Sequence, residues 1–295
     1  MQLFKQEKMS TKTRTGLLWA LTIVITVVSA IYQRSTGPTK PERITVEAGG
    51  EEYRFTLRRS HVVTRDLFIR LEDAPVGMEG RVLHRRYPTG EEWRATSLRR
   101  DGGMLAAQLP LQPPAGWIEY YLVLEQGGRE IFTNEDEPVR LRFRGDVPAM
   151  FMIPHILFMF MAMLFSNMTG IMVIFRHPGY RKYLRLTFWT LLVGGLVLGP
   201  IIQKYAFGDF WTGWPMGQDL TDNKTLVAFL FWALALYTNR NATKPKPVFA
   251  LVASIVLLLV YFIPHSMMGS MLDYETGEVV TGFLQAPVYH LIHIW

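Results

Sequence analysis

The 295-residue sequence contains no cysteine. This absence excludes disulfide bonds, thiolate metal sites, cysteine nucleophiles and thiol redox chemistry. A metal ion or cofactor would therefore have to be held by histidine, methionine or oxygen ligands. The sequence also lacks a P-loop, a Gly-x-Ser-x-Gly motif, a His-Glu-x-x-His motif and paired carboxylates within an apolar segment. Hydrolase, kinase and proton-pump activities thus have no support, and we expect a protein that is not an enzyme.

Charged residues are nearly absent from five apolar segments, although the whole chain carries a formal charge of +6 and is 49% hydrophobic. Apolar runs of this length are typical of membrane-spanning helices, and they exclude both disorder and a purely soluble fold. The predicted spans are residues 15–33, 149–176, 185–203, 225–239 and 247–264. Inside the second span, the polar residues Ser166, Asn167 and Thr169 are expected to hold neighbouring helices together.

The distribution of lysine and arginine orients these spans. The N-terminal tail, residues 1–14, and the junctions that follow the second and fourth spans together contain eleven basic residues and one acidic residue, Glu7. Basic residues favour the cytoplasmic side of a membrane, so we predict that the N-terminus lies inside and the C-terminus outside. This orientation indicates a bacterial inner-membrane protein in contact with the lipid bilayer. Residues 38–146, 204–224 and 265–295 then lie on the periplasmic or extracellular side.

Residues 38–146 differ from the rest of the chain because they form short alternating runs separated by glycine and proline turns. The predicted strands are Tyr53–Leu57, Leu67–Leu71, Gly80–Arg86, Trp93–Ser97, Met104–Leu109, Ile118–Glu125, Glu130–Thr133 and Val139–Phe143. Their spacing predicts an all-β sandwich of Ig-like or fibronectin-III-like type. The fold class is therefore a membrane α-helical protein with five transmembrane helices and an exported β-sandwich domain.

The predicted β-sandwich contains 17 basic and 18 acidic residues. This nearly neutral balance excludes a nucleic-acid partner. Its two histidines, His61 and His84, have no partner at the spacing of a metal site. We expect both imidazoles to lie at the surface of the domain.

Two other histidines flank the last four spans. His155 lies where the second span begins and His265 where the fifth span ends, and each follows an Ile-Pro dipeptide. The chain crosses the membrane four times between them, so both imidazoles are expected at the same outer surface. An imidazole at a bilayer border is costly, so each of these residues calls for a functional explanation.

The external loop between these histidines, residues 204–224, is rich in aromatic and glycine residues and then in polar residues. Such a shelf suits a flat amphipathic macrocycle, because indole faces pack the ring, histidine nitrogens ligate iron axially and a lysine meets propionates. We therefore predict a haem site. Its residues are His155 and His265 as iron ligands, with Trp211, Trp214 and Lys224 around the ring. In the same loop, Asp219, Asp222 and Asn223 resemble a cation site, but three oxygen-bearing residues of one loop more often cap the start of a helix, and we expect them to cap the fourth span.

Residues 150–270 resemble the haem-handling membrane proteins of cytochrome c maturation. In that family a tryptophan-rich external segment lies between two external histidines, with a pair of spans on each side. The family pattern, approximately Trp-Gly-x-x-Trp-x-Trp-Asp, corresponds here to Phe207-Gly208-x-x-Trp211-x-x-Trp214. Phenylalanine replaces the first tryptophan, one extra residue separates the second aromatic pair, no aspartate follows Trp214, and the β-sandwich is not part of the usual family plan.

This resemblance implies that His155 and His265 are axial haem ligands. It also implies that Trp211 and Trp214 line a platform for the ring, and it adds Phe207 at the position of the first tryptophan. The implied function is to bind or handle haem at the periplasmic membrane face, in cytochrome maturation or as an accessory of an electron-transfer complex.

Two other interpretations stay open. Tryptophan and tyrosine gather at the interfaces of all membrane proteins, so the loop and the histidines can be purely structural. The chain would then bind no cofactor and act as an assembly or accessory subunit, with its β-sandwich docked on a partner and its helices packed against other membrane subunits. Alternatively, thioether and imidazole ligands suit Cu(I). The methionines near the two histidines are Met150, Met152, Met159, Met267, Met268 and Met271.

Overall fold

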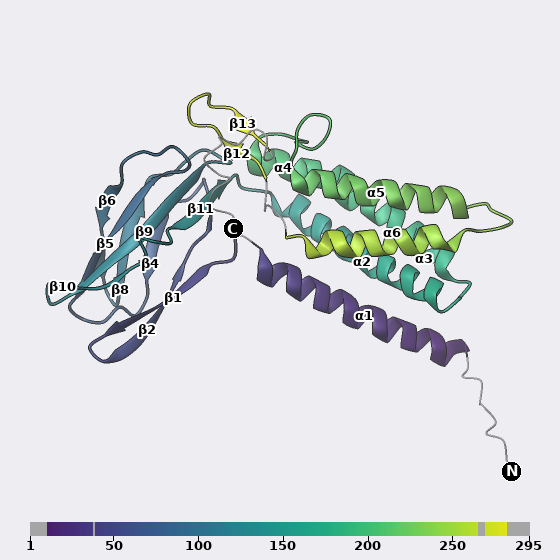
Figure 1. The fold of residues 1–295 in the computed structure, drawn as a ribbon, viewed down its shortest axis with the longest axis horizontal. Helices are drawn as coiled ribbons and strands as arrows, with labels where there is room; N and C mark the ends of the chain where they lie inside the picture. Colours follow the sequence, from purple (N-terminus) through teal and green to yellow (C-terminus); the bar gives the residue numbers. More distant parts are fainter. Residues whose placement is uncertain (1–10, 38, 265–268, 282–295) are drawn as a thin grey trace, which may run out of the picture. The chain divides into compact units, whose positions relative to one another are not determined.

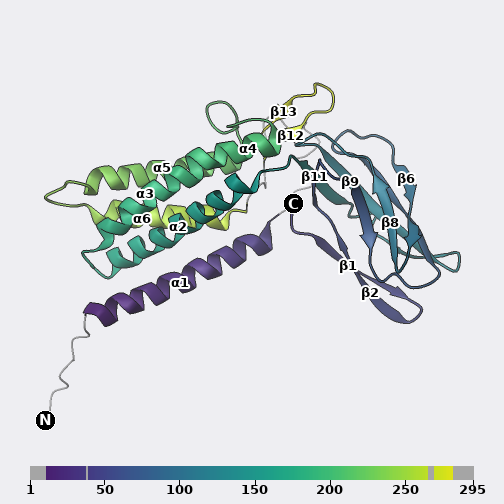
Figure 2. The ribbon, with the colours of Figure 1, turned by 180° about the vertical axis from the view of Figure 1, so that it is seen from behind.

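The computed structural model describes residues 11–37, 39–264 and 269–281, which Figures 1 and 2 show from two opposite sides. Its contacts divide the chain into two compact units. The helical unit comprises the described parts of Met1–Thr36, Ala149–Pro200 and Asn223–Pro264. The β unit comprises the described parts of Gly37–Pro148, Ile201–Asp222 and His265–Trp295. Each unit therefore combines segments that are distant in the sequence.

A helix occupies each of the five predicted apolar segments. The helices are α1 (Thr11–Thr36), α2 (Ala149–Ile174), a continuous helix made of α3 (Tyr180–Leu191), η1 (Leu192–Leu198) and α4 (Gly199–Phe207), then α5 (Leu220–Asn239) and α6 (Pro247–Phe262). Three described helices, Thr13–Thr36, Ala149–Ile174 and Tyr180–Phe207, are long and apolar enough to cross a membrane, and α6 is a shorter apolar helix. The chain is therefore compatible with insertion into a lipid bilayer.

Within the helical unit, α2 packs against α1, α3 and α6. Two of the polar residues predicted to hold helices together do so. The Asn167 side-chain amide donates to the Thr26 hydroxyl at 3.0 Å, and the Ser254 hydroxyl donates to the Ser166 carbonyl oxygen at 2.8 Å and lies 3.5 Å from the Ser166 hydroxyl. Thr169 instead donates to a carbonyl oxygen of its own helix. The interhelical bonds satisfy polar groups whose burial among apolar side chains would otherwise be costly.

The β unit contains the strands of residues 42–144 and a short strand pair in the tail. They are β1 (Glu42–Ala48), β2 (Glu51–Leu57), β3 (Ser60–Val62), β4 (Leu67–Leu71), β5 (Met78–Arg86), β6 (Arg94–Ser97), β7 (Arg99–Asp101), β8 (Met104–Leu109), β9 (Trp117–Gln126), β10 (Arg129–Thr133), β11 (Val139–Arg144), β12 (Met271–Leu272) and β13 (Val279–Val280). All eight predicted strands are confirmed to within two residues at each end. Strands β1, β3 and β7 and the tail pair were not predicted.

The strands of residues 42–144 form three sheets that share one hydrophobic core. The largest sheet has the order β3-β11-β9-β5-β6, with β10 also paired with β9, and the other two are β4-β8-β7 and β1-β2. Strand β3 runs parallel to β11, and the other pairs are antiparallel. Leu57 of β2, Leu71 of β4 and Leu122 of β9 come from different sheets and are all fully buried in this core. Burial of apolar area from three sheets therefore stabilises the strand-rich region as one folded body.

Two segments outside this region are bonded to it and complete the β unit. The Gly145 amide donates to the Ala206 carbonyl oxygen at 2.8 Å, which attaches the loop of residues 204–224. The Tyr274 hydroxyl accepts from the Trp117 amide at 3.0 Å and donates to the Trp117 carbonyl oxygen at 2.8 Å, which attaches the tail. This loop and the described part of the tail are therefore parts of a folded unit.

Both histidines of the strand-rich region are buried, so the prediction that they lie at the surface is wrong. His61 is 6% exposed and His84 is 5% exposed. His61 Nε2 lies 2.7 Å from the Arg65 carbonyl oxygen, and His84 Nε2 lies 3.1 Å from the Thr96 hydroxyl. Each imidazole thus has the hydrogen-bond partner that burial requires.

Acidification is expected to destabilise the β unit through His84. Burial lowers the pKa of His84, and the positive charge of Arg94 lowers it further. The unfolded chain, with the ordinary histidine pKa of 6.5, therefore binds a proton at pH values where the folded chain does not. The contribution of neutral His84 to stability is complete above pH 6.5 and is lost as the pH falls through the lower pKa of His84 in the folded chain. Thermal unfolding midpoints measured between about pH 5 and 8 should show a smaller pH dependence for His84→Gln, and an unchanged dependence would contradict this role.

Candidate functional site

His155, the predicted iron ligand at the start of α2, is half-buried and bonded to η1. Its Nδ1 lies 2.9 Å from the Gly194 carbonyl oxygen. A carbonyl oxygen only accepts, so Nδ1 carries a proton, and in the neutral ring Nε2 keeps its lone pair. Histidines that ligate metals are typically oriented in this way, by donation of the other ring N–H to a carbonyl or a carboxylate. The geometry therefore leaves Nε2 of His155 suited to coordination.

The carbonyl that orients His155 belongs to an unusual helical turn. Residues Leu192–Leu198 form a π-helix, a rare conformation that is frequent at functional sites. A Cβ added at Gly194 would lie 3.0 Å from both Met159 Sδ and Phe158 Cβ of α2. Glycine at this position thus lets η1 approach α2 closely enough for its carbonyl oxygen to meet the imidazole.

The second predicted iron ligand, His265, lies outside the described residues, and Met267 and Met268 lie there too. Axial pairing of His155 with His265 therefore stays a prediction. The other predicted haem residues are divided between the two units. Lys224 belongs to the helical unit, as His155 does, whereas the loop aromatics belong to the β unit.

Phe207, the aromatic residue at the end of α4, packs on a buried cation. The guanidinium carbon of Arg142 lies 3.8 Å from the centroid of the Phe207 ring. This is a cation–π contact between two residues of the β unit. The haem prediction places the Phe207 ring against the macrocycle. In the structure, a side chain of β11 occupies one face of this ring.

The two tryptophans of the loop differ in exposure. Trp211 is half-buried, and its indole N–H donates to the Trp214 carbonyl oxygen at 3.1 Å. The Trp214 side chain is 70% exposed, and Phe210 and Met216 beside it are 58% and 77% exposed. The loop therefore carries three exposed apolar residues. Apolar and aromatic side chains of this kind suit a membrane interface, a flat ligand or a partner protein.

Lys224, in the first turns of α5, is buried by contacts within the helical unit. Its ammonium group donates to the Ile263 carbonyl oxygen at 2.6 Å and to the Pro264 carbonyl oxygen at 3.3 Å. These carbonyls follow the last turn of α6, where a positive charge is favourable. The structure thus gives Lys224 backbone partners in place of the haem propionates that the prediction assigns to it.

Thr212, Asp219 and Asp222 form a buried polar cluster in the loop. Asp219 Oδ1 accepts from the Thr221 and Asp222 amides at 2.7 Å and 3.3 Å, which confirms the prediction that Asp219 caps the following helix. Asp222 Oδ2 instead accepts from the Thr212 amide at 2.7 Å and from its hydroxyl at 3.3 Å. Asp222 therefore links the first turn of α5 to Thr212 of the loop.

Arg142 is the central residue of the loop attachment, and the sequence did not reveal it. Its side chain is 2% exposed, and its Nη2 donates to the Ser270 carbonyl oxygen of the tail at 2.7 Å. The guanidinium carbon also lies 5.6 Å from the Trp117 ring centroid, besides its contact with Phe207. Burial lowers the pKa of Arg142 to about 10, and the negative charge of Asp219 opposes this shift. The residue therefore remains charged at neutral pH and holds the loop and the tail on β11.

The pattern of β11 explains why Arg142 was missed. Arg140, Arg142 and Arg144 alternate with apolar residues, so all three predict a solvated strand face. In the structure Arg140 is exposed and Arg144 is half-buried, while the loop and the tail cover the arginine between them. Only contacts that are distant in the sequence distinguish the three residues.

No family model matches the chain, and no significant match is found among curated proteins or solved structures. The local geometry of the two units is therefore the basis on which a function can be assigned.

Proposed function

We propose that the chain is a five-span bacterial inner-membrane protein with a cytoplasmic N-terminus and an exported β-sandwich of Ig-like or fibronectin-III-like type. The alternation of basic and acidic connecting segments supports this orientation. The core shared by the sheets supports the sandwich. The fully buried Tyr120, whose hydroxyl donates to the Arg58 carbonyl oxygen at 2.8 Å, supports it further, because tyrosines that bond back to the backbone recur in this fold.

The function we propose is haem binding at the outer membrane face, with His155 as an axial ligand. The observation that carries it is the bond between His155 Nδ1 and the Gly194 carbonyl oxygen, which orients the ring and leaves Nε2 to coordinate. When bound, haem would supply an iron centre for one-electron transfer, or would itself be the cargo. His265 is the proposed second ligand, and Trp211 and Trp214 are the proposed ring contacts.

The residues fit haem only in part. The donor set is suitable because imidazole ligates haem iron and indole faces pack a porphyrin. Phe207 and Lys224 do not fit the roles first assigned to them, since Arg142 covers one face of the Phe207 ring and backbone carbonyls hold the Lys224 ammonium. We therefore assign these two residues to packing and retain the histidines and tryptophans.

An absorption spectrum of the full-length protein in mild detergent tests this proposal. We expect a Soret band and a positive pyridine haemochrome assay for the unmodified protein, and loss of both for His155→Ala. The matched control is His177→Ala, because His177 is also half-buried but lies beyond the other end of α2 and accepts from the Gly179 amide. Haem loss in both variants, or an unmodified protein that takes up no haem, would contradict ligation by His155.

A cofactor-free accessory subunit is the second candidate, and a specific observation favours it. Polar and aromatic residues of the loop are used in internal bonds, including Phe207 on Arg142 and Thr212 on Asp222. Such a loop can serve to complete the β unit and to present its exposed apolar residues, Phe210, Trp214 and Met216, to a partner or to lipid. This candidate predicts no haem in any variant and unchanged co-purification of partner subunits with His155→Ala. Metal analysis of the same samples tests Cu(I) binding.

A further inference from the structure

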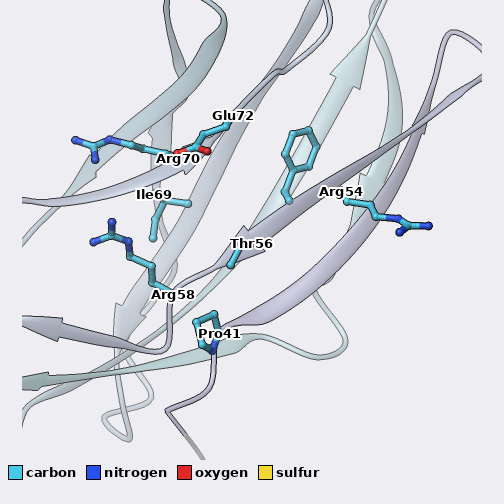
Figure 3. A pocket seen from close by; sticks show the side chains of 8 residues that line it. Pro41, Arg54, Thr56, Arg58, Ile69, Arg70 and Glu72 are labelled. Atoms are coloured by element: carbon cyan, nitrogen blue, oxygen red, sulfur yellow. The ribbon is translucent and has the colours of Figure 1, made fainter. Parts of the chain in front are cut away.

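A cleft in the β unit is lined by none of the residues of the haem proposal. Its volume is about 280 Å³, and β2 and β4 provide most of its lining. The lining includes Arg54, Phe55, Arg58, Ile69, Arg70 and Glu72 (Figure 3). The cleft belongs entirely to the strand-rich region, so its function can be considered independently of haem.

The cleft is positively charged, because three arginines and one glutamate line it. Arg58 and Arg70 point to the same side of the cleft in Figure 3, whereas Arg54 points to the opposite side. Arg54 has Glu52 at 3.9 Å, but among the described residues no carboxylate oxygen lies within 4.0 Å of a guanidinium nitrogen of Arg58 or Arg70. These two exposed guanidinium groups therefore lack the anion that such groups prefer.

The arginines of a second cavity in the same unit, by contrast, have partners within the protein. This cavity of about 480 Å³ is lined by Arg81, Arg100 and Glu125 among others. Arg81 lies 3.5 Å from Glu125, and Arg100 donates to three backbone carbonyl oxygens at 2.7–3.2 Å. The cations of this cavity are satisfied within the protein, whereas Arg58 and Arg70 of the cleft between β2 and β4 have no carboxylate partner among the described residues.

The two strands beside the cleft each have an unpaired edge. Among the described strands, β2 pairs only with β1 and β4 pairs only with β8. Strands β2 and β4 contact each other without forming a ladder. An unpaired strand edge presents a regular row of N–H and C=O groups to which an extended chain can add. Phe55 and Ile69 also line the cleft, but each is only 2% exposed and belongs to the core, so the strand edges and the arginines are what the cleft offers to a ligand.

We propose that the cleft binds an extended acidic segment of a partner protein. The segment would add as a strand beside β2 or β4 and place carboxylates on Arg58 and Arg70. Guanidinium and carboxylate groups match in bidentate geometry. An unpaired strand edge has no use in the binding of a lipid headgroup or a free anion, so its combination with the two arginines favours a peptide.

Fluorescence anisotropy with the full-length protein in neutral-lipid nanodiscs tests this proposal. The probe is a short labelled peptide that alternates valine and glutamate. We expect salt-sensitive binding that is weakened about tenfold by the double substitution Arg58→Gln and Arg70→Gln, as expected for the loss of two exposed ion pairs. The same peptide with alternate backbone nitrogens methylated should bind more weakly, because it cannot add to a strand edge.

The matched control is the double substitution Arg43→Gln and Arg99→Gln, which removes two exposed arginines outside the cleft. This variant should bind the peptide as the unmodified protein does. Equal losses of peptide affinity in both double variants would show that binding depends only on net charge, and this result would overturn the proposal. Absence of peptide binding would also overturn it, as would arginine-dependent binding of inorganic phosphate or anionic vesicles without binding of the peptide.

Discussion

Replacement of Arg142 by alanine is expected to lower the free energy of unfolding of the β unit by about 3 kcal/mol, the range seen when one partner of a buried charged network is removed. The substitution leaves the Ser270 carbonyl oxygen without its donor and removes the cation that packs on Phe207. It also leaves the buried Asp219 without the nearby positive charge that interacts with it. Loss of one side chain therefore weakens the attachment of both the loop and the tail.

The effect can be measured by the thermal unfolding midpoint of the full-length protein, together with limited proteolysis. We expect new cleavage sites within residues 208–218 and 269–281 of the Arg142→Ala variant. Arg140→Ala is the control, because this arginine belongs to the same strand but is exposed and only covers the Tyr87 ring at 4.3 Å. The free energy of unfolding of Arg140→Ala should fall only by the contribution of an exposed cation–π contact, about 0.5–1 kcal/mol. Full stability of Arg142→Met would show that side-chain volume, and not the guanidinium group, holds the segments in place.

Replacement of Gly145 by alanine is the second change with a large expected effect. A Cβ at this position would overlap the Tyr205 carbonyl oxygen, which is a backbone atom and cannot rotate away. The neighbouring Gly145 amide donates to the Ala206 carbonyl oxygen at 2.8 Å, so relief of the overlap breaks this bond. We expect a loss of about 3 kcal/mol in the free energy of unfolding, at the upper end of the usual cost of overpacking.

Gly103→Ala is the control for this prediction. Gly103 lies in the turn before β8, and a Cβ added there meets no atom within 4 Å. Its unfolding midpoint, measured beside that of Gly145→Ala in the same detergent, should stay close to that of the unmodified protein. Equal stability of the two variants would show that the contact between residue 145 and the loop contributes nothing to the β unit.

The local pattern of apolar and polar residues was sufficient to predict most of the helices and strands. The apolar segments predicted the positions of all five helices, because an uninterrupted apolar run leaves few alternatives. Alternation predicted eight strands, and β4 and β8 agree with the prediction at both ends. Strand β1 was missed although Ile44, Val46 and Ala48 alternate regularly. Strands β3 and β7 have three residues each, which is too short for a period to be recognised.

The candidate site was less predictable, because its chemistry depends on contacts between distant segments. The sequence identified His155 as a residue that needs an explanation, but not its bond to Gly194, since a π-helix has no simple apolar period. It identified Lys224 and Phe207 as polar and aromatic, but not the carbonyls and the guanidinium group that hold them. A charged side chain that is covered by a distant loop looks the same in the sequence as one that faces water.

The composition of the β unit from three stretches has a consequence for biosynthesis. Residues 37–148 leave the ribosome first, the stretch around Phe207 follows after two helices, and the stretch around Tyr274 follows after two more. Until the last stretch is synthesised, Arg142 lacks the Ser270 carbonyl oxygen and the Trp117 amide lacks the Tyr274 hydroxyl. Completion of this unit therefore requires all three stretches, and a chain that stalls before residue 269 would lack the bonds of Arg142 to Ser270 and of Trp117 to Tyr274.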